Sequence, residues 1–151
     1  MKKLLILMLE DLILLKKDAI DVKDFYIDQK IIDTIKHSYK DGYLPCIVVN
    51  TSTSNTTFYS KAEYAFIFRK LKSDIRVATR NFTIEFIIVD GTESKDEEDK
   101  LPNPYIMYQI AIDNKVSLRD SVIIGDDISV MEFAYNAGIG TFLNTKDIYE
   151  A

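Results

Sequence analysis

Acidic side chains directly follow two of the apolar runs in the sequence. Glu10 comes after the run Leu4–Leu9, and Asp126 and Asp127 come after Ser121–Ile124 and one glycine. Carboxylate oxygens are the ligands that a hard cation such as Mg²⁺ prefers, and a bound Mg²⁺ can activate water. These three acids are therefore candidate metal ligands. The alternative interpretation is that they are solvated acids at the ends of strands.

The other reactive side chains predict no site of their own. Cys46 is the single cysteine, so it can form neither an internal disulfide nor a thiolate-rich zinc site, and its apolar neighbours predict an inert, buried thiol. His37 is the only histidine and has no cysteine or second histidine near it, so we expect it at a surface or a helix end. The polar stretch Asn50–Ser60 is typical of turns, whose side chains bond their own backbone.

Five short apolar runs predict the strands of a parallel sheet. Strands that are covered on both faces lose the alternating pattern and become continuously hydrophobic. The runs are Leu4–Leu9, Cys46–Val49, Ile84–Val89, Ser121–Ile124 and, more weakly, Gly140–Leu143.

Helical patterns with recognisable ends separate these runs. A first helix has apolar residues at helical intervals over positions 31–39 and ends at Asp41-Gly42. A second begins at Ser60, which has the capping-box spacing with Glu63.

Two further helices have their own cap signals. For the third helix, Asn103 is a preferred N-cap residue and Pro104 suits the first helical position. For the fourth, Ser129 and Glu132 form another capping pair, and Gly138 supplies the left-handed residue that ends it.

Alternating strands and helices predict right-handed crossovers and a Rossmann-like three-layer α/β sandwich with a central parallel sheet. The length of 151 residues fits one domain over 1–151. The charged run Gly91–Lys100 is expected to be an exposed loop.

Charge and hydropathy indicate which classes of partner to expect. The net charge of -5 does not favour binding to nucleic acid. The first apolar run is too short for a signal peptide or a membrane span, which needs about 20 residues. We therefore expect a cytoplasmic protein that binds neither nucleic acid nor membrane.

The segment Leu101 to Ile139 resembles the C-terminal half of haloacid dehalogenase (HAD) superfamily phosphatases. The resemblance is to the small capless type, such as histidinol phosphatase, heptose bisphosphatase and the polynucleotide phosphatases. In that family Lys-Pro-x-Pro opens a helix, the next strand ends in Gly-Asp-x-x-x-Asp, and the following helix ends in Asn-Ala-Gly. The segments LPNP, GDDISV and NAG have this spacing here. The resemblance implies a single HAD-like domain with no cap domain.

The first strand, KKLLILMLED, lies where the family has Asp-x-Asp. The first family aspartate attacks phosphorus and forms an aspartyl-phosphate, and the second is the general acid and base. In this sequence the nucleophile position falls on Met8 and the acid/base position on Glu10. A thioether cannot attack phosphorus.

The other catalytic positions of the family also differ. The hydroxyl that holds the phosphoryl group falls on Asn50, with Thr51 next to it, and the lysine falls on Leu101. The second carboxylate of the Gly-Asp motif falls on Val130, so only Asp126 keeps its place. Because such residues act as one unit, the resemblance implies that phosphoryl transfer by the family mechanism is lost.

Three functions follow from this reading. The first is a HAD-like pseudophosphatase, inactive or severely impaired, that acts by binding or within an assembly. The alternative is an unorthodox Mg²⁺-dependent phosphomonoesterase that uses Glu10, Asp126 and Asp127. The third is a structural or assembly component in which the remnant of the family's active site has no role.

The cofactor and partner expectations follow from the same three readings. No cofactor is required, and Mg²⁺ binds only if the remnant site still holds it. The expected partners are a protein, a second copy of the chain or a small phosphorylated ligand. Tyrosines at helical spacing are expected to lie half-buried at the core edge rather than in an interface. The candidates for such an interface are Tyr59, Tyr105, Tyr108, Tyr135 and Tyr149.

Overall fold

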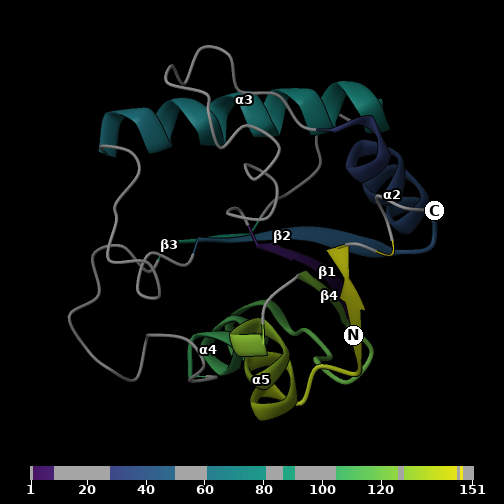
Figure 1. Cartoon of the computed structure of the whole chain (residues 1–151), viewed down its shortest axis with the longest axis vertical. Helices are drawn as coiled ribbons and strands as arrows, with labels where there is room; N and C mark the ends of the chain where they lie inside the picture. Colours follow the sequence, from purple (N-terminus) through teal and green to yellow (C-terminus); the bar gives the residue numbers. More distant parts are fainter. Residues whose placement is uncertain are drawn as a thin grey trace.

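The computed structural model describes residues 2–8, 28–49, 61–80, 87–90, 105–125, 128–145 and 147. Within these ranges strands and helices alternate along the chain, as the sequence predicts (Figure 1). The elements are β1 (Lys3–Met8), α2 (Gln29–Lys40), β2 (Tyr43–Val49), α3 (Lys61–Thr79), β3 (Ile87–Asp90), α4 (Tyr105–Asn114), β4 (Val122–Gly125), α5 (Ile128–Ala137) and β5 (Thr141–Asn144).

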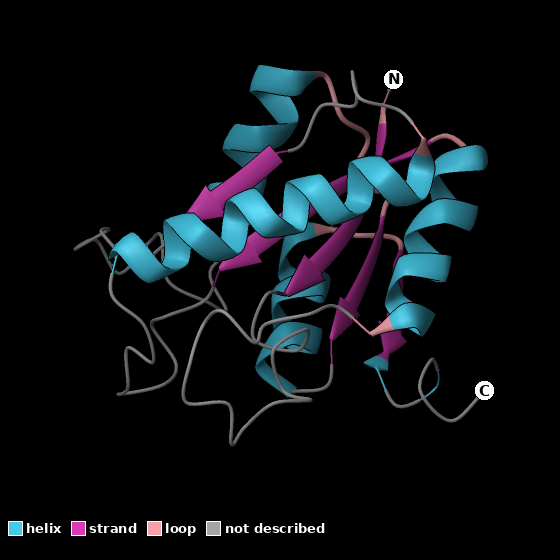
Figure 2. Cartoon of the chain, turned by 90° about the horizontal axis from the view of Figure 1, so that it is seen from above, coloured by secondary structure: helices cyan, strands magenta, loops and turns pink. Residues whose placement is uncertain are grey.

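The five strands form one parallel sheet in the order β3-β2-β1-β4-β5. The first strand is therefore the central one, with Leu7 paired with Ile47 of β2 on one side and Ile124 of β4 on the other. The strands run side by side with their carboxyl ends at one edge (Figure 2). This arrangement confirms the predicted Rossmann-like sandwich.

Helices cover both faces of the sheet. Helices α2 and α3 lie on one side and α4 and α5 on the other (Figure 1). Successive side chains of a strand point to opposite faces, so β1 contributes to both cores. Leu5 and Leu7 pack in the cluster that includes α2 and α3, whereas Leu4, Ile6 and Met8 pack in the cluster that includes α4 and α5. Both clusters are apolar, which explains why β1 shows no alternation in the sequence.

Local residue types explain where two helices begin and end. The Asp28 carboxylate accepts a hydrogen bond from the Lys30 amide at 2.8 Å and caps α2. This helix ends at Asp41 and Gly42, as predicted, and the glycine has a φ of 93°. Gly138 ends α5 with a φ of 73°, also as predicted.

Several predicted boundaries need correction. Strand β2 begins at Tyr43, three residues before the predicted Cys46, and β4 and β5 each lie one residue later than predicted. Helix α5 begins at Ile128, so Ser129 lies inside the helix and is not its N-cap. The capping-box spacing of Ser129 with Glu132 therefore placed the start of this helix too late.

Some predictions fall on residues that the structure does not describe. Helix α3 begins at Lys61, directly after Ser60, but the capping contact itself lies outside the described residues. The predicted cap residues Asn103 and Pro104 and the predicted loop Gly91–Lys100 also lie outside the described residues. No helix among the described residues is both long and apolar enough to cross a membrane.

Candidate functional site

The carboxyl ends of β1 and β4 lie beside each other. Met8 is the last residue of β1 and Gly125 the last of β4, and the residues just before them, Leu7 and Ile124, are paired. After β1 the chain forms β2 and β3 on one side of β1, and it then forms β4 and β5 on the other side. This is a topological switch point, where open α/β sheets form a crevice for ligands.

A buried hydroxyl fixes the two strands at their opposite end. The Leu4 amide donates a hydrogen bond to Ser121 Oγ at 2.9 Å, and this hydroxyl donates to the Ser117 carbonyl oxygen at 2.7 Å. The bond from the Leu4 amide is buried and so shielded from water, and the bond to Ser117 is partly buried. Ser121 directly precedes β4 and therefore helps to set the register that brings Gly125 beside Met8.

Met8 and Val130 are the two family catalytic positions that the structure describes. Met8 is 2% exposed and Val130 is 4% exposed. Both belong to the apolar cluster that also contains Met107, Ile123 and Phe133. The side chains at these two positions fill the core between the sheet and the helices α4 and α5, and neither can donate or accept a proton.

The remaining predicted site residues lie outside the described ranges. Their roles stay predictions of the resemblance. They are Glu10, Asn50, Thr51, Leu101, Asp126 and Asp127. In the sequence, Glu10 is the second residue after Met8, and Asp126 is the first residue after Gly125. Met8 and Gly125 end the adjacent strands β1 and β4.

The described part of the site does not fit a magnesium ion. Mg²⁺ requires oxygen ligands, and Met8 and Val130 offer a thioether and an aliphatic side chain. Among the described residues there is also no group of three or more His, Cys, Asp or Glu side chains that could hold a metal.

The expectations for Cys46 and His37 are confirmed. Cys46 is fully buried in β2, and burial raises the pKa of its thiol to about 12. Such a thiol stays protonated and is a poor nucleophile. His37 is exposed in the last turn of α2.

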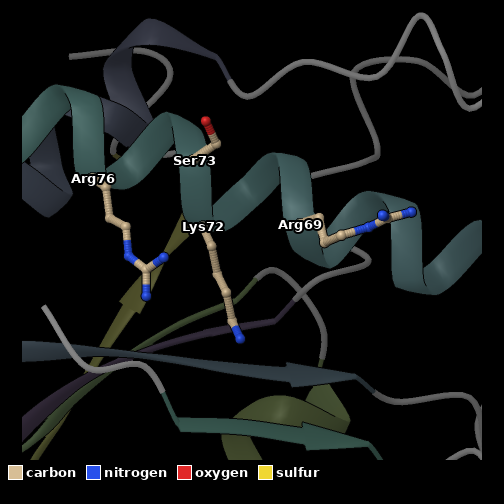
Figure 3. Close-up of a pocket in the computed structure, with 4 residues that line it drawn as sticks. All are labelled: Arg69, Lys72, Ser73 and Arg76. Atoms are coloured by element: carbon tan, nitrogen blue, oxygen red, sulfur yellow. The ribbon is translucent and has the colours of Figure 1, made fainter. Parts of the chain in front are cut away.

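Sequence reasoning missed a pocket on α3. The pocket has a volume of about 250 Å³, and Arg69, Lys72, Ser73 and Arg76 line it (Figure 3). The signal was present, because these positions are three, four and seven residues apart and so share one side of a helix. Net charge, which describes the whole chain, gave no sign of it.

Comparisons with known proteins identify the fold. No family model and no curated protein sequence matches the chain. Among solved structures, a Mesorhizobium loti protein assigned as a HAD-like phosphatase has a TM-score of 0.72 at 15% identity, covering 99% of this chain and 83% of that one.

Two further solved structures are similar. The D,D-heptose 1,7-bisphosphate phosphatase of B. bronchiseptica, solved with magnesium and phosphate, has a TM-score of 0.73 at 18% identity, covering 93% of this chain and 79% of that one. The core domain of a Streptococcus pneumoniae protein assigned as a phosphoglycolate phosphatase has a TM-score of 0.56 at 17% identity, covering 95% and 80%. The chain therefore has the HAD-like fold of these phosphatases, which confirms the fold that the resemblance implied.

Proposed function

We propose that this protein is a HAD-fold pseudophosphatase that does not transfer phosphoryl groups and acts by binding, as a partner of another molecule or as part of an assembly. The observation that carries the proposal is the burial of Met8 and Val130 in one apolar cluster. On the resemblance, both positions hold carboxylates in the active family members.

The chemistry of the family explains the consequence of these two side chains. Phosphoryl transfer through an acyl-phosphate needs a carboxylate oxygen at position 8, and the neutral thioether of Met8 cannot form that intermediate. A valine at position 130 removes a further negative charge from the site. Because members of a catalytic unit act together, losing both leaves little of the rate enhancement.

Exposed apolar side chains on α4 and α5 support the binding part of the proposal. On α5, Ile128, Met131 and Tyr135 recur at helical spacing, and Tyr135 is 86% exposed. On α4, Tyr108 and Ile112 are exposed. Apolar surface of this kind is typical of interaction sites.

The two helices are joined at this surface. The Tyr108 hydroxyl donates a hydrogen bond to the Asn136 carbonyl oxygen at 2.8 Å, which connects α4 to α5. The expectation that such tyrosines lie half-buried is wrong for Tyr135, because its side chain follows the outer face of α5.

The test is phosphate release from p-nitrophenyl phosphate and a panel of sugar and nucleoside phosphomonoesters with excess Mg²⁺. The proposal predicts release no faster than in buffer. Release that disappears in both Glu10→Ala and Asp126→Ala would contradict it. Release that is unchanged in these variants comes from a contaminating enzyme.

Calorimetric titration with Mg²⁺ separates the proposal from its alternative. A phosphomonoesterase that uses Glu10, Asp126 and Asp127 must bind the metal in the millimolar range or tighter, and must lose that binding when Asp126 becomes alanine. An absence of saturable heat at millimolar Mg²⁺ removes the alternative.

A further inference from the structure

We draw no further inference here: the strongest candidate, the exposed apolar face of α5 formed by Ile128, Met131 and Tyr135, already supports the proposed function, and nothing in the part of the chain that the structure describes shows what covers it.

Discussion

Met8 and Val130 lie in the same buried apolar cluster, although the first ends the central strand β1 and the second lies in the first turn of α5. On the family resemblance, both positions carry carboxylates in an active site. Here they contribute to the packing between the sheet and a helix. Their burial explains how the HAD-like fold can persist without the charges that the family chemistry requires.

Restoring a carboxylate at the end of β1 should destabilise the protein. Met8→Asp places a charge among apolar side chains, and we expect a loss of at least about 3 kcal/mol in the free energy of unfolding. The matched control, Met8→Leu, keeps the apolar volume and should cost less than about 1.5 kcal/mol. Urea unfolding followed by circular dichroism measures both. Equal losses would show that position 8 faces water.

Removing the Ser121 hydroxyl should weaken the pairing between strands β1 and β4. In Ser121→Ala the buried Leu4 amide loses its acceptor, which costs about 1–3 kcal/mol. Ser117→Ala is the control, because the Ser117 hydroxyl bonds Asp120 at an exposed position. Hydrogen exchange at the Leu4 amide should accelerate only in the first variant. Unchanged protection would mean that this bond does not hold the strands.

A side chain at Gly140 should disturb the start of β5. An added Cβ would lie 1.8 Å from the Arg119 carbonyl oxygen, so the backbone must move. We expect Gly140→Ala to cost more than about 2 kcal/mol. At Gly138 nothing lies within 4 Å of an added Cβ, and only its φ of 73° is unfavourable, so Gly138→Ala should cost about 1 kcal/mol. Thermal unfolding measures both variants, and a larger loss of stability in Gly138→Ala than in Gly140→Ala would contradict the prediction.

The buried thiol of Cys46 should make stability fall at alkaline pH. Burial raises its pKa from 9.0 to about 12, so above pH 9 the unfolded chain loses a proton that the folded chain keeps. The protonated thiol's contribution to the free energy of unfolding is fully present below pH 9. It decreases as the pH rises, by about 1 kcal/mol between pH 8 and pH 10. Urea titrations of the unmodified protein and of Cys46→Ala should differ in this slope. Identical slopes would show that the thiol is not buried.

Most of the fold follows from the sequence because buried parallel strands and capped helices leave strong local signals. The central strand β1 is apolar on both faces, and Gly42 and Gly138 occupy the left-handed positions where helices end. The start of α5 was misplaced because the capping-box spacing of Ser129 and Glu132 also occurs inside a helix, where both residues lie here. Such boundaries depend on contacts across the sheet, which a linear pattern does not contain.

The candidate site was only partly predictable. The family resemblance assigned Met8 and Val130 to altered catalytic positions, but their shared burial depends on how α5 packs against β1. The α3 pocket was missed because the net charge hides a local group of cations. Tyr135 was expected at the core edge, and its exposure is decided by the rotation of α5 rather than by its spacing.

Oxygen exchange between phosphate and water tests the central claim most directly, because it needs no knowledge of a substrate. An enzyme that forms an aspartyl-phosphate reversibly from inorganic phosphate releases water in that step, and so replaces ¹⁸O of labelled phosphate with solvent oxygen. With excess Mg²⁺, we predict that this protein causes no exchange above the rate in buffer. Exchange that requires Mg²⁺ and disappears in both Glu10→Ala and Asp126→Ala would contradict the account.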